Sequence, residues 1–214
     1  MESESLKKSL EEAINKSPKR NFGESIDIAV NLKDVDLSNP KNRLNEEIVL
    51  PNGRGRKVKI GLISGNEMAS KAKGTADKFI SAEELDKMSD DKRATKKMVN
   101  DIDFFIAEIA LMPRVGKILG GIMGPRGKMP RPVPANVDPV PIINNLRKTV
   151  KARSKERPVV HVPIGTKDMD LEKVAQNGLE VLKRIESKLE KGEDNIRTVY
   201  VKTTMGPAVK VEVK

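Results

Sequence analysis

A glycine-rich, basic segment in the middle of the chain has residue types that could bind phosphate. It runs from Gly116 to Pro130 and ends in Gly-Pro-Arg-Gly-Lys-Met-Pro. A P-loop requires Gly, four residues, Gly-Lys and then a Ser or Thr hydroxyl for magnesium. Here Met129 follows Lys128, and Ile122 stands where the leading glycine belongs. NTPase chemistry is therefore not predicted. Two interpretations stay open: a loop whose backbone approaches RNA phosphates, or a tight structural turn.

A second segment, Lys202-Thr-Thr-Met-Gly-Pro207, places two hydroxyls and a glycine where a strand must end. Threonine hydroxyls and free backbone amides at such a turn can bond ribose and phosphate oxygens, and the ribose 2′-OH distinguishes RNA from DNA. A plain hairpin turn explains the same spacing. The residue types alone therefore leave both interpretations open.

Several classes of function are excluded by residue types that the chain lacks. It has no cysteine, which rules out disulfides, Cys-ligated metal sites and a thiol nucleophile. His161 is the only histidine, and its place in the apolar run 159–163 is more typical of a structural residue. We expect no catalytic residue, no metal and no cofactor. No apolar run approaches the roughly 20 residues of a membrane-spanning helix, and residues 1–8 lack the apolar region of a signal peptide.

The charge of the chain is unevenly distributed and points to a polyanionic partner. Its 214 residues carry a net charge of +10, and residues 109–137 contain no acidic side chain. A local field of one sign attracts nucleic acid, although a solvated basic surface is the plain alternative. The cations of this stretch are candidate secondary phosphate contacts: Arg114, Lys117, Arg126, Lys128 and Arg131.

The chain has only four Phe, one Tyr and no Trp. Proteins that bind single strands stack bases on aromatic rings. Recognition of a folded RNA by shape, phosphate and ribose contacts therefore fits this composition better than a stacking platform.

The two ends of the chain have a common α+β pattern. Residues 25–32 alternate apolar and polar side chains, which predicts a strand with one buried face. Residues 171–191 repeat apolar positions at helical spacing, and 198–204 and 208–214 read as strands.

The middle of the chain has the pattern of a parallel α/β sheet. Residues 58–63 form a nearly continuous apolar strand, a helix follows over 66–73, and 103–107 predicts another strand. Residues 115–119 read as a helix that ends at Gly120-Gly121. The simplest arrangement is an outer α+β domain of residues 1–51 and 149–214 with an inserted parallel α/β domain of residues 52–148.

Several motifs resemble the large-subunit ribosomal protein L-one family of the ribosomal stalk. They are Phe22-Gly-Glu-Ser-Ile-Asp27, Leu50-Pro-Asn-Gly53, the stretch 116–134, His161-Val-Pro-Ile-Gly165 and Tyr200–Pro207, in this order along the chain. The short N-terminus is similar to the archaeal branch.

The resemblance implies a two-domain protein with an outer α+β domain that binds structured large-subunit rRNA and an inserted Rossmann-like α/β domain, residues 52–148. It further implies a role in release of deacylated tRNA from the exit site and repression of translation by binding its own mRNA. The protein is expected to be cytoplasmic, within the large ribosomal subunit, monomeric when free and without a membrane partner. A non-ribosomal RNA-binding regulator of the same fold is the alternative.

The resemblance also implies which residues contact RNA. Lys202 departs from the hydroxyl associated with its position, which makes its role less certain. The implied RNA-binding residues are Phe22, Ser25, Asp27, Thr198, Lys202, Thr203, Thr204, Met205, Gly206 and Pro207.

Overall fold

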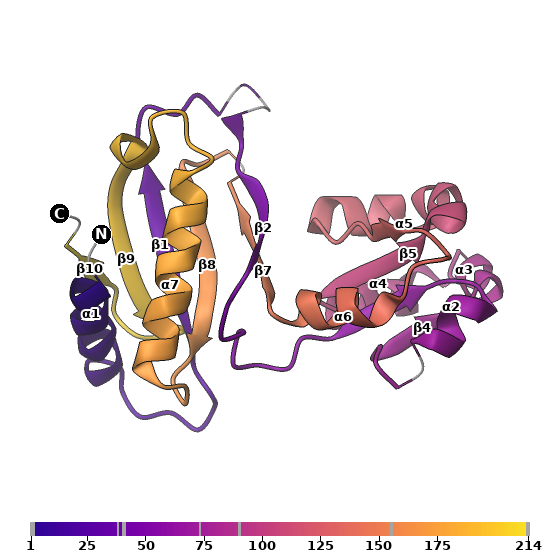
Figure 1. The fold of residues 1–214 in the computed structure, drawn as a ribbon, viewed down its shortest axis with the longest axis horizontal. Coiled ribbons are helices and arrows are strands. Elements are labelled where there is room, and N and C mark those ends of the chain that lie inside the picture. The colour runs from indigo at the N-terminus through magenta and orange to yellow at the C-terminus, as the bar shows by residue number, and fades with distance from the viewer. Residues whose placement is uncertain are drawn as a thin grey trace. The chain divides into compact units, whose positions relative to one another are not determined.

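The computed structural model describes residues 3–37, 39, 42–72, 74–89, 91–154 and 156–212 (Figure 1). The chain divides into two compact units, unit 1 (Met1–Arg56 and Lys148–Lys214) and unit 2 (Lys57–Arg147). Unit 1 contains α1 (Ser3–Asn15), β1 (Ser25–Leu32), β2 (Asn45–Val49), β7 (Thr149–Arg153), β8 (Val159–Thr166), α7 (Leu171–Glu186), η3 (Gly192–Asn195), β9 (Ile196–Thr203) and β10 (Val209–Val211). Unit 2 contains β3 (Ile60–Ile63), α2 (Asn66–Lys71), β4 (Lys78–Ile80), α3 (Ala82–Lys87), α4 (Lys92–Asp101), β5 (Phe104–Glu108), η2 (Ile109–Leu111), α5 (Met112–Arg126), β6 (Arg131–Val133) and α6 (Pro139–Arg147).

Unit 1 is built on an antiparallel sheet with the strand order β10-β9-β1-β8. One face of β1 carries the apolar side chains of Ile26, Ile28, Val30 and Leu32. Helices α1 and α7 pack on this face of the sheet (Figure 1). This follows from the two-residue period of a strand, which places every second side chain on the same face. The opposite face of β1 carries Ser25, Asp27 and Asn31, so the sheet presents polar groups there. A separate two-stranded sheet joins β2 to β7.

Unit 2 is built on a parallel sheet with the order β4-β3-β5-β6. One face packs on α2 and α6 through residues such as Met68 and Ile143. The other face packs on α3, α4 and α5 through residues such as Leu85 and Leu119. Because both faces are covered, the central strands β3 and β5 are apolar and buried except for Glu108 at the end of β5, as the continuous apolar run in the sequence indicates. The edge strands β4 and β6 each begin with two exposed residues. The predicted fold class, an α+β part from both termini with an inserted parallel α/β part, is confirmed.

The predicted helix over residues 115–119 is present, but its predicted end at Gly120-Gly121 was wrong, and so was the interpretation of the glycine-rich segment up to Arg126 as a loop or tight turn. Residues 112–126 form α5, which continues through Gly120, Gly121 and Gly124. Val115, Leu119 and Met123 lie on one face of this helix and are fully buried, and this burial overrides the low helix propensity of glycine. The helix ends at Gly127, whose φ of 65° is the left-handed conformation that glycine adopts without strain.

Other boundaries differ by a few residues. β8 continues past the expected Val162 to Thr166, and its register with β1 shifts between Ile26 and Asp27, because β8 has one extra residue, Ile164, at this point. The predicted long helix ends at Glu186 rather than Lys191. Residue 73 of one predicted helix and residues 213–214 of the last predicted strand lie outside the described residues.

Candidate nucleic-acid interface

The start of β1 and the end of β9 meet at a turn formed by residues 203–207. The backbone N–H of Thr204 donates to the Ser25 carbonyl at 2.9 Å. The Thr204 hydroxyl accepts from the Ser25 N–H at 3.0 Å and donates to the Ser25 carbonyl at 3.1 Å. The two segments that carry most of the predicted contacts are therefore fastened to each other, although they lie at opposite ends of the sequence.

Two large apolar side chains lie exposed at this turn. Met205 is 61% exposed and Phe22 51% exposed. Phe22 lies in the sequence between Arg20 and Ser25. The Nη2 atom of Arg20 donates to the Met205 carbonyl at 3.4 Å. Exposed apolar groups beside ordered hydroxyls and carbonyls can cover sugar and base surfaces while the polar groups bond to them.

Gly206 is required by close packing within the turn. Its N–H donates to the Thr203 carbonyl at 3.2 Å. A Cβ at this position would collide with the Thr203 hydroxyl oxygen, so the Thr203 side chain would have to shift, and its hydrogen bond to Ser17 would be disturbed. The Gly206-Pro207 pair thus fixes the path of the chain after β9.

A buried polar network supports the turn from below. Glu24 is 2% exposed, and its Oε2 accepts from the Ser17 hydroxyl at 2.9 Å and lies 3.5 Å from Lys167 Nζ. The Thr203 hydroxyl donates to Ser17 Oγ at 3.1 Å. Burial alone would raise the pKa of Glu24, but the Ser17 and Thr203 hydroxyls and the Lys167 charge together hold that pKa below its usual range. Glu24 therefore remains ionised beneath the surface.

This network corrects one predicted contact and adds residues that the sequence analysis missed. The Thr203 side chain is fully buried, so it supports the turn and is not available at the surface. Glu24, Ser17 and Lys167 were not predicted. One signal was present in the sequence. Glu24 is spaced by two residues from Ile26 and by four from Ile28, which places its carboxylate on the same inward side as these apolar residues.

The polar face of the sheet extends the surface away from the turn. Asp27 lies directly opposite Lys202 in the β1–β9 ladder. Burial raises the pKa of the Asp27 carboxyl, and the nearby positive groups Arg54, Lys202 and His161 offset this only in part. Thr198 lies on the same face opposite Asn31, whose Nδ2 donates to its hydroxyl at 2.7 Å. Thr198 is about 13 Å along β9 from Lys202, outside the turn.

Asn177 on α7 places the segment that carries Arg54. Its side chain accepts from the Asn52 N–H at 3.1 Å and donates to the carbonyls of Gly53 and Ile164, both at 2.8 Å. Asn177 is fully buried, so these bonds are protected from water. The Leu50-Pro-Asn-Gly53 motif is thereby fixed beside α7.

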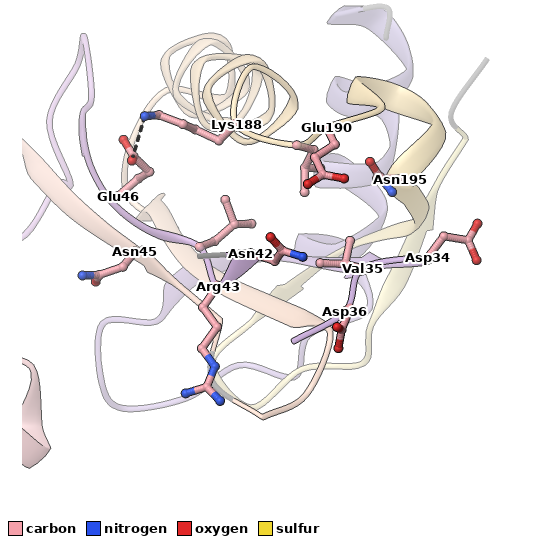
Figure 2. Close-up of a pocket in the computed structure, with 12 residues that line it drawn as sticks. Asp34, Val35, Asp36, Asn42, Arg43, Asn45, Glu46, Lys188, Glu190 and Asn195 are labelled. Atoms are coloured by element: carbon pink, nitrogen blue, oxygen red, sulfur yellow. Dashed lines mark ion pairs between the residues drawn. The ribbon is translucent and has the colours of Figure 1, made fainter. Parts of the chain in front are cut away.

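One pocket of unit 1 lies beyond Leu32, at the end of β1 opposite to the turn. It has a volume of about 340 Å³ and is lined by residues that include Asp34, Asp36, Glu46 and Glu190 (Figure 2). Lys188 lies across it with its Nζ 3.1 Å from Glu46 (Figure 2). Its predominantly acidic lining repels phosphate, so the candidate interface is the projecting turn and not this pocket.

The five predicted secondary phosphate contacts in unit 2 are not equally available. Arg114 forms an ion pair with Asp86. Arg126 Nε donates to Asn100 Oδ1 at 2.7 Å. Lys128 Nζ donates to the carbonyls of Val99, Asn100 and Ile102 at 2.9, 3.0 and 2.5 Å. It thereby supplies a hydrogen-bond donor to carbonyls at the C-terminal end of α4, which have no donor within the helix. Lys117 and Arg131 are exposed.

The carboxyl edge of the parallel sheet is where α/β proteins commonly hold nucleotide phosphates. Here the Gly65 N–H, at the start of the helix after β3, donates to Glu108 Oε2 at 2.9 Å. A carboxylate of the protein itself therefore occupies the position that a phosphate would need. Within the described ranges, no group of His, Asp and Glu side chains could hold a metal ion, and no described helix is long and apolar enough to cross a membrane.

Comparison with known proteins adds an independent observation. The model of the family described as "Ribosomal protein L1p/L10e family" matches residues 10–207. The chain belongs to this family. The ribosomal protein L1p/L10e family is not a family of enzymes, so the expectation that the chain is not an enzyme is confirmed.

The archaeal character of the chain is also confirmed. Proteins named "Large ribosomal subunit protein uL1" from Thermoplasma acidophilum and Thermoplasma volcanium are 56% identical over 207 residues and 53% identical over 211 residues. These matches cover 97% and 99% of this chain and 95% and 97% of the relatives. The protein of that name from Methanothermobacter thermautotrophicus is 47% identical over 211 residues, covering 96% of this chain and all of the relative.

Proposed function

We propose that the protein is a structural constituent of the large ribosomal subunit in the cytoplasm and that unit 1 binds a structured segment of large-subunit rRNA in the mobile stalk. The family membership and the name shared by its relatives support the ribosomal role. The single observation that carries the site is the turn 203–207, which is hydrogen-bonded to Ser25 and exposes Met205, while the exposed Phe22 precedes Ser25 by three residues.

The rigidity of this turn explains how it would recognise a folded RNA. The Ser25–Thr204 bonds and the Glu24 network are already formed in the free protein, so little conformational entropy is lost when RNA binds. Remaining acceptor positions on carbonyls and hydroxyls bond ribose 2′-OH groups, and Met205 and Phe22 exclude water from these bonds. Recognition then depends on RNA shape rather than on net charge.

Two further functions follow from the family resemblance. The same surface would bind a stalk-like structure in the protein's own mRNA, so that free protein represses its own translation once rRNA sites are filled. As part of the stalk, the protein would assist release of deacylated tRNA from the exit site. We assign specific RNA binding to unit 1. We assign to unit 2 the attraction of the phosphates of other RNA in the ribosome, such as tRNA or neighbouring rRNA.

The test is binding of the full chain to a hairpin that represents the rRNA stalk site, against a scrambled hairpin of the same length. Affinities are measured at about 50 and 200 mM salt, because non-specific phosphate binding falls steeply over this range. We expect a preference for the stalk hairpin that persists at the higher salt. Equal and steeply salt-dependent binding to both hairpins would contradict the proposed recognition of shape.

Two additional measurements separate the parts of the proposal. A fragment of the protein's own mRNA leader should compete with the stalk hairpin for one site. Co-sedimentation with the large subunit separates a ribosomal constituent from a non-ribosomal regulator, since the regulator would bind RNA in solution and stay out of the particle.

A further inference from the structure

Helix α4 of unit 2 exposes a strongly basic face. Its residues Lys92, Arg93, Lys96 and Lys97 are all exposed, while Thr95 and Val99 face the core. The four cations fall within two helical turns on one side of the helix, because residues three and four apart are neighbours on a helix surface. The sequence analysis placed the candidate phosphate contacts on a different segment and did not predict this one.

None of these four cations forms an ion pair or a side-chain hydrogen bond with a residue in the described part of the chain. The acidic residues at the two ends of α4 are already engaged. The carboxylate of Asp91 accepts from the N–H groups of Arg93 and Ala94 at 3.0 and 2.9 Å as the helix cap. The carboxylate of Asp101 binds Lys59 Nζ at 2.7 and 2.9 Å.

The arrangement of charge on α4 destabilises the helix. Lys92 and Arg93 occupy the first turn, where the helix dipole disfavours positive charge. Lys92 with Lys96, and Arg93 with Lys97, are like-charge pairs at i,i+4 spacing. By contrast, α7 follows the favourable pattern, with Glu172 in its first turn and Lys183 and Arg184 in its last.

A cluster of exposed cations that costs stability and forms no ion pair within the described part of its own chain is typical of a functional surface. The outward side of α4 carries no large apolar residue that could enter a membrane. The open groove beside Ala94 and Met98 is lined by further exposed cations, which include Lys78 and Lys87, and by carboxylates, which include Asp77, Glu84 and Asp101.

We propose that this α4 face binds the phosphate backbone of a double-helical RNA without reading its sequence. The proposal rests on the protein's being RNA-binding, but it concerns an RNA segment other than the one at the turn of unit 1. Four cations that contact phosphates release counterions on binding, so this contact is strong at low salt and weak at high salt.

The test replaces all four cations by glutamine, as K92Q/R93Q/K96Q/K97Q, in the full chain. Its matched control is K7Q/K16Q/R184Q/K188Q, which removes the same charge from four residues of unit 1 that are already in ion pairs. Binding to a generic 20-base-pair RNA duplex, to tRNA and to the stalk hairpin is followed by fluorescence anisotropy from 50 to 200 mM salt.

We expect the α4 variant to bind the duplex and tRNA at least about tenfold more weakly at low salt. Its salt slope should be lower by about one unit for each phosphate that the variant no longer binds. The control variant should bind as the unsubstituted protein does. The melting temperature of the α4 variant should be unchanged or higher, because the like-charge pairs are gone, and this measurement separates weaker RNA binding from a folding defect.

Three outcomes would overturn the proposal: unchanged duplex binding by the α4 variant, an equal decrease in the control variant, or tighter binding of the unsubstituted protein to anionic lipid vesicles through the same residues. Weaker binding to tRNA alone would show that base or shape recognition replaces the proposed backbone contact. If the unsubstituted protein does not prefer the stalk hairpin, the function proposed for unit 1 is wrong. The comparison of the α4 variant with its control on duplex RNA still tests the α4 face in that case.

Discussion

The turn 203–207 of unit 1 and the α4 face of unit 2 are both exposed polar surfaces, yet they are built in opposite ways. At the turn, Thr204 is hydrogen-bonded to Ser25, and the buried Glu24 accepts a hydrogen bond from the Ser17 hydroxyl. On α4, four cations have no partner among the described residues and repel each other. An organised surface of low charge suits recognition of shape, whereas unpaired charge suits attraction of any polyanion.

This difference shows why net charge alone does not locate a specific RNA site. Residues 52–148 carry 19 basic and 11 acidic side chains, whereas the two outer segments together carry 22 and 20. The charge excess therefore points to the inserted part of the chain, although the organised turn lies in the outer part. Arg114 and Lys128 are already bonded within the protein, to the Asp86 carboxylate and the Val99 carbonyl respectively. Such cations must be left out when the net charge of a segment is used to locate a phosphate-binding surface.

The largest expected effect is on affinity at the turn. Thr204→Ala or Met205→Ala should each weaken binding of the stalk hairpin by about 1–3 kcal/mol, because a shielded hydrogen bond or a desolvated apolar surface is removed. Met129→Ala is the control, since Met129 is also exposed, at 43%, but lies in unit 2. If both turn variants bind as tightly as the unsubstituted protein, residues 203–207 are only a structural turn.

Lys128 tests whether an internally bonded cation also serves RNA. Lys128→Met should lower the stability of unit 2 by about 1.5–3 kcal/mol, because three carbonyls lose a charged donor. The salt slope for duplex RNA should remain the same, in contrast to the decrease expected for the α4 variant. Urea unfolding measures the effect on stability, and anisotropy titrations measure the effect on RNA binding. A lower salt slope for the variant would show that Lys128 contacts RNA phosphates as well as the protein carbonyls.

Glu24 tests the support beneath the turn. Its folded-state pKa lies below the unfolded value of about 4.3, so the carboxylate contributes stability above that pH, and the contribution is lost as the pH falls through the folded-state value. Glu24→Gln should cost about 1–2 kcal/mol at neutral pH and flatten the fall in stability as the pH is lowered from about 5 into the acid range. Thermal unfolding across this pH range measures both, and an unaltered acid profile would show that Glu24 does not carry this dependence.

The smallest expected effect is a gain. A Cβ at Gly116 on α5 would meet no atom within 4 Å. Gly116→Ala should therefore stabilise the helix by about 0.5–1 kcal/mol and leave binding of every RNA unchanged. Reduced binding of either RNA would indicate that the bare backbone of α5 approaches RNA, as a phosphate-binding role for this segment requires.

Much of the fold could be predicted from the sequence because its patterns are local. The alternation over 25–32 and the helical repeat from Leu171 each correspond to an observed element with one buried face. Ser81 caps α3 as its type suggests, accepting from the Glu84 N–H at 3.2 Å. The sequence therefore identified the elements wherever local propensity and core packing agree.

The remainder depended on contacts between distant parts of the chain. The continuation of α5 from Gly120 to Arg126 is favoured by burial of Leu119 and Met123 in the core, which the local propensity of these glycines does not reveal. The roles of Arg114 and Lys128 depend on partners contributed by other helices. The Thr204 segment could be found as a candidate, but its attachment to Ser25 could not be derived from spacing.

The strand order of unit 1 also determines when its RNA surface can exist. β1 lies between β8 and β9, which are translated only after the whole of unit 2. Unit 2 has all its strands once residue 147 has been made, so it can fold on the ribosome while β1 still lacks both neighbours. The surface that joins Ser25 to Thr204 is therefore completed only at the end of synthesis, and incomplete chains do not compete with finished protein for RNA.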